Sequence, residues 1–252
     1  MAEDTIPKKR QYTYNITKSS QNCSHLSIAS ISFNNNNKYV MIKLDALINL
    51  IKKENINIIF ISNLSYDSYT YINDKIDKLY HNVQVFKTEE IRIGTVLFLR
   101  KDIIGFDKSN DNPYYFDLEN SSMERKIIGC EIRYAGKLIN IIGICAETNL
   151  ENEHIRTEQI NILSGIIKDM ALSDYIIVGN FESEEKYPLG NDVWIKLGCS
   201  NILRANRKER IYYTSENMEI ISYTLIGITP CADGVSDSLA LHSGILCSFS
   251  IN

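Results

Sequence analysis

Three features of the sequence carry residue types that could do chemistry. An acidic loop holds Glu182, Glu184 and Glu185, whose carboxylates could bind a divalent metal ion. His242 stands just before an apolar run near the C-terminus, and Cys145 ends another apolar run. A histidine can act as a general acid or base, and a cysteine thiolate can act as a nucleophile.

Each of these features also has a structural interpretation. A loop with several acidic residues is usually a solvated surface, and a lone histidine at a strand end is usually structural. No Cys-His-Asn pattern can be argued around Cys145, so a buried structural cysteine is favoured. We therefore prefer structural roles for all three features and keep a displaced metal site at the acidic loop as the alternative.

A basic segment, RANRKER, carries Arg204, Arg207, Lys208 and Arg210. Four cations could contact a few phosphates, which would give weak, salt-sensitive binding to nucleic acid. The whole chain, however, has 27 Lys plus Arg against 31 Asp plus Glu, for a net charge of -4. No global positive field draws it onto nucleic acid. A solvated loop is therefore preferred over a phosphate or nucleic-acid surface.

The elements that must position these residues alternate between strand-like and helix-like patterns, which predicts an α/β layered domain. Residues 101–123 are polar and predict a long loop. Residues 1–24, with Lys8, Lys9 and Arg10, predict a polar arm ahead of one domain over 25–252. Helices are expected at 45–55, 67–80 and 153–170, and strands at 26–33, 56–64, 83–86, 94–99, 126–133, 138–145, 175–178, 210–214, 220–226 and 244–251.

Composition bounds the class of protein. With 252 residues and 44% hydrophobic content, the chain can bury one sizeable core. Its six cysteines lie far apart without a CxxC pair, which is typical of a reducing compartment. The first residues lack the apolar stretch of a signal peptide, and no apolar run is long enough to span a membrane. We expect an intracellular, cytoplasmic protein, with the nucleus as the alternative, that is neither secreted nor membrane-bound.

Several short motifs, in this order of elements, resemble the endonuclease/exonuclease/phosphatase (DNase I-like) superfamily over roughly residues 25–252. GNFE at 179–182 stands where that family has G-D-F-N, and RTEQ at 156–159 matches its R-x-x-Q. RIYY at 210–213 stands where it often has R-I-D-Y, and His242 where it has S-D-H before a final strand. The resemblance implies a four-layer α/β sandwich, helix–sheet–sheet–helix, and metal-assisted hydrolysis of phosphoesters.

The same resemblance implies that most of the catalytic groups are replaced. Asn63 stands at the family's main Mg²⁺-binding Glu, and Asn180 at the Asp that activates water, so both lose a charge. Glu182 would face the substrate phosphate in place of an Asn. Among the catalytic residues of the family, only the histidine is retained, as His242. The remaining replaced positions are Ser32 for an Asn, Cys145 for a His, and Tyr212 and Leu241 for Asp residues.

The sequence therefore predicts a catalytically inactive protein without a cofactor that acts through a protein partner or self-assembly, because a fold can persist after its site is lost. The first alternative is a Mg²⁺-dependent nuclease, phosphodiesterase or phosphatase with a rearranged site, and the second is a weak nucleic-acid-binding module that uses RANRKER and the arm at 8–10. The rearranged site would be built from Asn63, Asn180, Glu182, Asp237 and His242.

Overall fold

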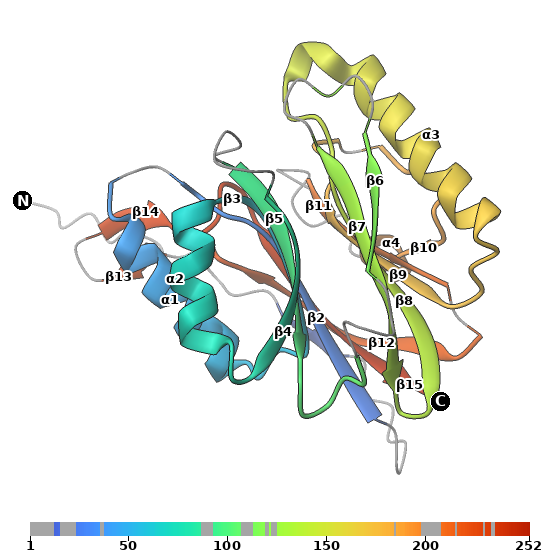
Figure 1. Cartoon of the computed structure of the whole chain (residues 1–252), viewed down its shortest axis with the longest axis horizontal. Coiled ribbons are helices and arrows are strands. Elements are labelled where there is room, and N and C mark those ends of the chain that lie inside the picture. Colours follow the sequence, from blue (N-terminus) through green and yellow to red (C-terminus); the bar gives the residue numbers. More distant parts are fainter. Residues whose placement is uncertain are drawn as a thin grey trace, which may run out of the picture.

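Two mixed β-sheets pack face to face, and helices cover their outer faces (Figure 1). This arrangement confirms the expected four-layer α/β sandwich. The computed structural model describes residues 13–15, 24–35, 38–86, 93–106, 113–118, 121, 125–183, 185–197, 208–214, 216–228, 230–232 and 235–252. Within these ranges, no helix is long and apolar enough to cross a lipid bilayer.

The first sheet has the strand order β1-β12-β15-β2-β3-β5-β4. Its only parallel pair among the described strands is β2 with β3, which α1 (Val40–Lys53) connects. This pair places Ser32 beside Ser62 at neighbouring strand ends. α2 (Tyr66–Ile76) follows β3 on the same outer face (Figure 1). The strands are β1 (Thr13–Asn15), β2 (Ser24–Ser32), β3 (Ile58–Ser65), β4 (Tyr80–Val85), β5 (Ile93–Arg100), β12 (Met218–Ile226) and β15 (Gly244–Ile251).

The second sheet has the strand order β10-β11-β9-β8-β7-β6. β8 and β9 run parallel, with a short 3-10 turn, η1 (Leu150–Asn152), and α3 (Glu153–Asp169) between them. Cys145 therefore lies beside Asn180 at the strand ends. The strands are β6 (Tyr114–Asp117), β7 (Lys126–Tyr134), β8 (Lys137–Cys145), β9 (Tyr175–Asn180), β10 (Asn191–Asp192) and β11 (Glu209–Tyr213); α4 (Val193–Lys196) follows β10, and β13 (Pro230–Ala232) pairs with β14 (Val235–Ser238).

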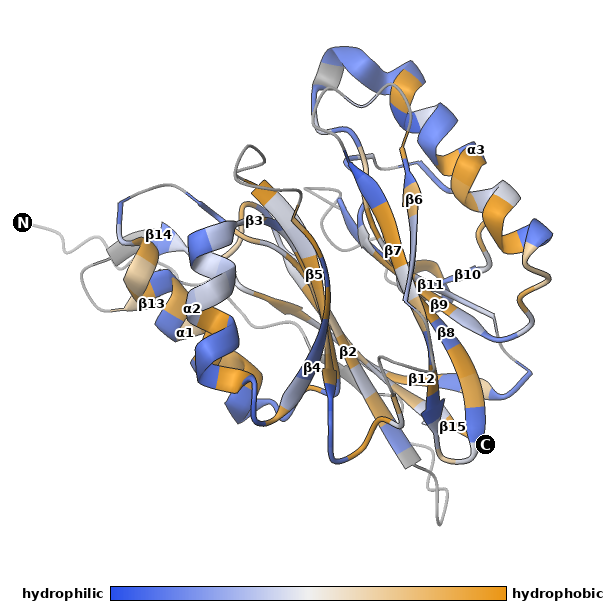
Figure 2. Ribbon diagram, in the orientation of Figure 1, coloured by the Kyte–Doolittle hydropathy of each residue, from blue (hydrophilic) through white to orange (hydrophobic). Residues whose placement is uncertain are grey.

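Many residues of the central strands are hydrophobic (Figure 2), and the buried apolar side chains form three clusters between the layers. The central strands are apolar on both faces because each face meets another layer. α1 buries Leu44, Leu47, Ile48 and Ile51, the spacing of one helical face. Close packing between the sheets requires glycine at Gly143, where an added Cβ would lie 2.5 Å from the Phe60 ring. The sandwich is therefore held together by three apolar layers.

The expected start of the first helix, at Asp45, is wrong. α1 begins at Val40, and its N-cap residue Tyr39 has a left-handed backbone with φ of 66°. No side chain caps this end with a hydrogen bond. The usual start signal, an Asp or Ser at the cap, is therefore missing where the helix begins, and Asp45 sits inside the helix.

The segment 101–123, expected to be a loop, contains an edge strand. β6 pairs with β7, and its side chains alternate between half-buried and exposed. Three residues of the expected arm, Thr13–Asn15, likewise pair with β12 as the edge strand β1. Edge strands such as these are held by backbone pairing, so short polar sequences can form them. The remainder of residues 1–23 lies outside the described residues, and the domain boundary at residue 24 stays a prediction.

The expected hairpin is confirmed by β7 and β8, which pair from Ile128 to Tyr134. Its two turn residues both have positive φ, 50° at Ala135 and 79° at Gly136. Positive φ at both central positions characterises the type I′ turn, whose twist matches that of paired strands.

We predict opposite effects of alanine at two glycines. A Cβ at Gly179 in β9 would lie 1.8 Å from the carbonyl oxygen of Ile144 in β8, whereas nothing lies within 4 Å of a Cβ at Gly165 in α3. Gly179→Ala should lower the free energy of unfolding by about 3 kcal/mol, because the two strands must separate. Gly165→Ala should raise it by about 1 kcal/mol, because alanine favours helix. Urea unfolding measures both, and equal stability of the two variants would contradict the close β8–β9 approach.

Candidate functional site

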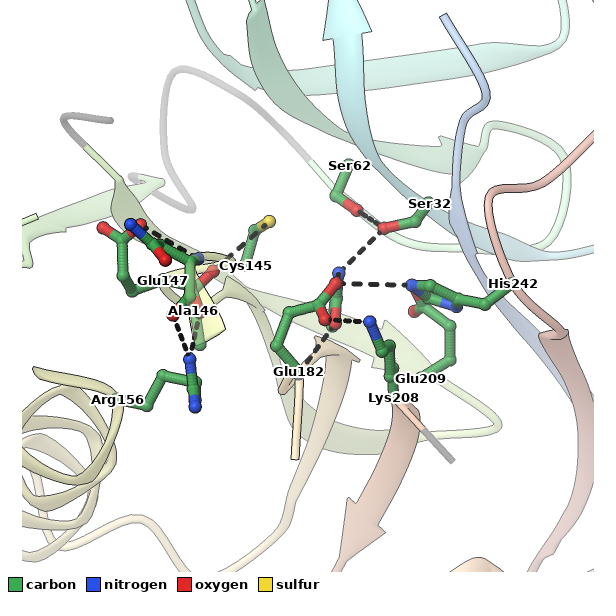
Figure 3. Close-up of polar contacts among 12 residues, drawn as sticks. Ser32, Ser62, Cys145, Ala146, Glu147, Arg156, Glu182, Lys208, Glu209 and His242 are labelled. Carbon is green, nitrogen blue, oxygen red and sulfur yellow. Dashed lines mark hydrogen bonds and ion pairs between the residues drawn. The ribbon is translucent and has the colours of Figure 1, made fainter. Parts of the chain in front are cut away.

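Polar side chains from both sheets meet at the strand ends (Figure 3). The parallel pairs β2–β3 and β8–β9 bring their carboxyl ends to this place, and β11 and the turn before β15 complete it. We call this group the polar cluster. Its members are Ser30, Ser32, Ser62, Asn180, Glu182, Lys208, Glu209 and His242.

Glu182 lies at the centre of the polar cluster, directly after β9. Its backbone N–H donates to Asn180 Oδ1 at 2.8 Å, and Asn180 Nδ2 donates to Glu182 Oε1 at 2.9 Å. The Lys208 ammonium lies 2.5 Å from Glu182 Oε2, and His242 Nε2 lies 3.7 Å from Oε1. The side chain is only 6% exposed. A nearly buried carboxylate is thus neutralised by a lysine of the same protein.

The pKa of Glu182 reflects this environment. Burial by itself raises the pKa of a carboxyl group, because it disfavours the charged form. Here the nearby His242 and Lys208 side chains and the hydrogen bond from Asn180 outweigh burial and lower the pKa of Glu182 to about 2. Glu182 therefore carries its negative charge at neutral pH, and its strongest partner is the Lys208 ammonium.

Asn180 joins the two sheets. Besides Glu182, its Nδ2 donates to Ser32 Oγ at 3.1 Å, and the hydroxyls of Ser32 and Ser62 lie 2.6 Å apart. Asn180 is nearly fully buried. Its amide group is therefore occupied on both the oxygen and the nitrogen side by protein atoms, and an amide cannot accept a proton as a carboxylate can.

Glu209 is a second buried carboxyl group, which the sequence analysis missed. Ser30 Oγ donates to its Oε2, while Oε1 makes no hydrogen bond with any described residue and lies 3.8 Å from His242 Nε2. Burial raises the pKa of Glu209, although His242 and the serines oppose this. The neutral form of Glu209 is thus favoured relative to an ordinary glutamate.

Glu209 was missed because the register of β11 was predicted incorrectly. RIYY was matched to R-I-D-Y, which put Tyr212 at a site position. Tyr212 instead points to the outer face of the second sheet and packs against Phe181. Residues of β11 alternate, so Ile211 and Tyr213 face the other sheet, and Glu209 lies on that same side. The alternation of β11, counted back from Ile211, was the signal that could have identified Glu209.

Three other predicted site positions lie near the polar cluster, but their side chains do not take part in it. Asn63 Nδ2 donates to the backbone oxygen of Phe33 at 3.0 Å, so this amide fastens the end of β2. Cys145 is buried, and burial raises the pKa of its thiol. Leu241 donates its backbone N–H to Ser32 O at 3.0 Å, while its side chain is 53% exposed. None of these side chains supplies a charge to the polar cluster.

The R-x-x-Q motif anchors the loop after β8. Arg156 Nη1 donates to the backbone oxygen of Asn149 at 2.5 Å, and the backbone N–H of Glu147 donates to Gln159 Oε1 at 2.8 Å (Figure 3). Ser121 Oγ donates to the buried carboxylate of Glu147 at 3.2 Å. Arg156 and Gln159 therefore position the chain that leaves Cys145.

The basic segment does not form the expected surface of four cations. Arg210 is buried: its Nη1 lies 3.2 Å from Asp192 Oδ2, and its Nη2 donates to Ser183 O at 2.8 Å. Lys208 is bound to Glu182. Arg204 and Arg207 lie outside the described residues. The two described cations thus hold protein segments together and are not directed at a phosphate.

The polar cluster does not fit the Mg²⁺ ion that the family resemblance implies. Across the described ranges, no group of three or more His, Cys, Asp or Glu side chains is arranged to hold a metal ion. An ammonium already contacts the charged carboxylate Glu182, and Asn63 is turned to Phe33. Asp237 forms an ion pair with Lys43 at 3.3 Å on another side of the first sheet. Of the acidic loop, Glu185 is exposed and Glu184 lies outside the described residues.

We predict opposite pH effects for the two glutamates. Because the pKa of Glu182 is lowered from 4.5 to about 2, its charge stabilises the fold above about pH 4.5, and this is lost as pH falls toward 2. The pKa of Glu209 is raised, so Glu209 stabilises the fold below about pH 4.5 and less as pH rises.

Near neutral pH, Glu182→Gln should lower the free energy of unfolding by about 2 kcal/mol. This loss is smaller than that expected for breaking a fully buried ion pair, because Lys208 is partly exposed.

Glu209→Gln should leave stability at neutral pH unchanged or raise it, because it removes a buried group that is costly to ionise. Urea unfolding of both variants and the wild type across the acid range tests this. The same loss of stability in both variants would contradict the assignment of charge to Glu182.

Comparison with known proteins rests on the fold, because the chain matches no protein-family model and no curated protein in sequence. D. rerio TDP2 in complex with single strand DNA product is 19% identical, with a TM-score of 0.77 over 90% of this chain and 99% of that one. The human Nocturnin catalytic domain with bound sulfate is 12% identical, with a TM-score of 0.72 over 99% of this chain and 100% of that one. An endonuclease/exonuclease/phosphatase family protein from Bacteroides thetaiotaomicron is 9% identical, with a TM-score of 0.72 over 92% and 99% of the two chains. The chain therefore shares the fold of these solved structures, an α/β sandwich consistent with the DNase I-like fold.

Proposed function

We propose that this protein is a catalytically inactive member of the endonuclease/exonuclease/phosphatase fold, without a metal cofactor, that acts by binding a protein partner or by self-assembly. One observation carries the proposal: the Lys208 ammonium contacts Glu182 at 2.5 Å, so the charged carboxylate of the polar cluster is already neutralised. Such a carboxylate is a poor ligand for a second cation.

Apart from His242, the side chains of the polar cluster offer no suitable proton acceptor. General-base hydrolysis needs a group that takes a proton from water near neutral pH. The pKa of Glu182 is about 2, which makes it a weak base, and Asn180 has no basic atom. Glu209 is fully buried and hydrogen-bonded to Ser30. These features favour a structural role for the polar cluster.

Two alternatives are less well supported by the positions of the side chains. The rearranged metal site needs Asn63 and Asp237, but these contact Phe33 and Lys43 instead. The nucleic-acid module needs the cations of RANRKER, of which Arg210 is buried against Asp192. TDP2 is seen with single strand DNA product, but the described cations of RANRKER, Lys208 and Arg210, are both paired with carboxylates of this chain.

Four exposed apolar residues near the polar cluster favour binding to a protein. We call them the rim: Met41, Ile42, Tyr66 and Leu241. Leu241 is bonded through its backbone to the end of β2, and Tyr66 directly follows β3. Both side chains are large, apolar and more than half exposed. The start of α1, which follows β2, exposes Met41 and Ile42 as well. Exposed apolar side chains beside strand ends are typical of protein-binding surfaces when they form a contiguous patch.

The cysteines favour an intracellular location. Among the described residues, Cys130, Cys145, Cys231 and Cys247 form no disulfide with one another, and all but Cys231 are buried. Thiols of this kind persist in reducing compartments. We therefore place the proposed interaction inside the cell.

The purified protein should not hydrolyse DNA, RNA or inositol polyphosphates above background with Mg²⁺ or Mn²⁺, because Glu182, the charged carboxylate of the polar cluster, is already paired with Lys208. Product release measured beside Asn180→Ala and His242→Ala variants tests this. Turnover that either variant abolishes would establish catalysis at the polar cluster and refute the proposed function.

The rim should carry the proposed interaction. Leu241→Asp places a charge at an exposed apolar position, and should reduce co-purification of a defined partner from the native source at least about tenfold, since one buried charge costs more than about 1.4 kcal/mol. Leu138→Asp is the matched control, because Leu138 is similarly exposed on the β7–β8 hairpin. Quantitative mass spectrometry compares the two. Equal recovery with both variants would place binding elsewhere.

A further inference from the structure

Two carboxyl groups and one ammonium group surround His242 between the two sheets (Figure 3). His242 Nε2 lies 3.7 Å from Glu182 Oε1 and 3.8 Å from Glu209 Oε1, and Lys208 contacts the other oxygen of Glu182. The side chains of Glu182 and Glu209 are 6% and 0% exposed. Two carboxylates and one ammonium leave one negative charge uncompensated. In a place this buried, such a charge is costly.

The hydrogen bonds of this group are also incomplete. Ser30 Oγ donates to Oε2 of Glu209, but Oε1 is not hydrogen-bonded to any described residue. The same holds for both ring nitrogens of His242. Without a proton between them, Glu209 Oε1 and His242 Nε2 are two acceptors that face one another. A proton on either atom makes a donor of it and also cancels the remaining negative charge.

The neighbouring side chains do not supply this charge. Those of the polar cluster on β2, β3 and β9 are neutral serines and an asparagine. Cys145, at the end of β8, is a neutral thiol because burial raises its pKa. The Arg125 guanidinium also acts on Cys145, but the Ser121 hydroxyl ties Arg125 to a buried carboxylate: it accepts from the backbone N–H of Arg125 and donates to Glu147. Arg125 and Glu147 therefore add one charge of each sign.

We propose that Glu209 and His242 hold one proton between them and form a proton-dependent clasp between the two sheets. Glu209 belongs to β11 of the second sheet, and His242 directly precedes the turn into β15 of the first. With the proton bound, the buried group is neutral and the strand ends stay together. When the proton leaves, one buried negative charge is uncompensated, and the contact between the strand ends loosens.

The environment of Glu209 favours the protonated form. Burial raises the pKa of Glu209 above its ordinary 4.5 and Glu182 adds to the shift, while His242 and Ser30 oppose it. A carboxyl group with a raised pKa stabilises the folded state fully below about pH 4.5, and this stabilisation is lost as pH rises. The pKa of Glu182 is lowered to about 2, so its contribution is constant above about pH 4.5. Of the two glutamates, only Glu209 makes stability fall as pH rises.

The clasp lies beside the rim. Leu241 directly precedes His242, and its backbone N–H donates to Ser32 O at 3.0 Å. Loosening of the clasp would therefore also change the position of Leu241. That consequence for partner binding rests on the proposed function, whereas the clasp itself does not.

The test compares the full-length wild type with Glu209→Gln in urea between about pH 5 and 9, where tyrosine and lysine remain largely protonated. The glutamine amide can accept from Ser30 and donate to His242, as a protonated carboxyl group can. The unfolding constant of the wild type should rise relative to that of the variant by up to about tenfold per pH unit, the dependence that one released proton gives. The same pH dependence in both proteins would overturn the proposal.

Two further variants identify the proton-binding groups. His242→Gln removes a group that favours the charged form of Glu209, so the fall in stability should move to higher pH. A fall at the same pH as in the wild type would mean that His242 takes no part, and the clasp would be refuted. Glu131→Gln is the matched control, because β7 contributes no member to the polar cluster. It should keep the wild-type dependence, and its loss there would indicate a general effect of charge and overturn the clasp.

Hydrogen exchange of the Leu241 amide measures the local opening. Its protection factor should fall as pH rises in the wild type and stay constant in Glu209→Gln, because exchange of a hydrogen-bonded amide requires that the bond opens. Constant protection in the wild type would contradict the loosening of the strand ends.

If Glu209→Gln does not fold, Ser30→Ala replaces it. The Ser30 hydrogen bond favours the charged form of Glu209, so its loss should move the fall in stability to higher pH. No movement in that variant would overturn the proposal. Hydrolysis by the wild type would refute the proposed function and leave the clasp standing, and a stability that does not respond to these variants would do the reverse.

Discussion

The arrangement around the polar cluster depends on one constraint: the negative charge of Glu182, placed between two sheets, must be compensated. Lys208 does this at 2.5 Å, and its own position is fixed by the backbone bond from Phe181. Asn180 links the same carboxylate to Ser32 on the opposite sheet. A buried charge without these partners would cost several kcal/mol. The polar contacts between the two strand ends can therefore be understood as a means of keeping one carboxylate charged inside the protein.

The apolar frame brings these groups together and does not depend on their chemistry. Two parallel pairs, β2–β3 and β8–β9, end at the same place because helices connect each pair across an outer face of the sandwich. Gly179 and Gly143 allow the strands and the sheets to approach closely. Close packing of this kind tolerates exchange of polar groups at strand ends, because those groups lie outside the apolar layers. The fold can thus match that of TDP2 and Nocturnin while the strand ends of this chain carry Ser62, Asn180 and Lys208.

The sequence predicted the buried elements better than the edges. Strands such as Ile58–Ser65 and Gly244–Ile251 were predicted well because they are largely buried on both faces and most of their side chains are apolar. β1, β6 and the β13–β14 pair were missed, since backbone pairing with a neighbour holds them and their own composition gives little signal. The start of α1 was misplaced because its cap, Tyr39, is not a residue type that usually begins a helix.

At the candidate site, the sequence by itself determined which charges were absent: Asn63 and Asn180 are amides whatever their surroundings. It also indicated the strand ends where they would lie, because strand order and buried patterns follow from local sequence. Only the tertiary structure decided that Lys208 neutralises Glu182 and that Glu209, in place of Tyr212, faces His242. These pairings join residues from different segments, and a one-residue difference in the register of β11 moves a side chain to the other face of the sheet. Local patterns do not fix that register, which is set by contacts with β9 and the opposite sheet.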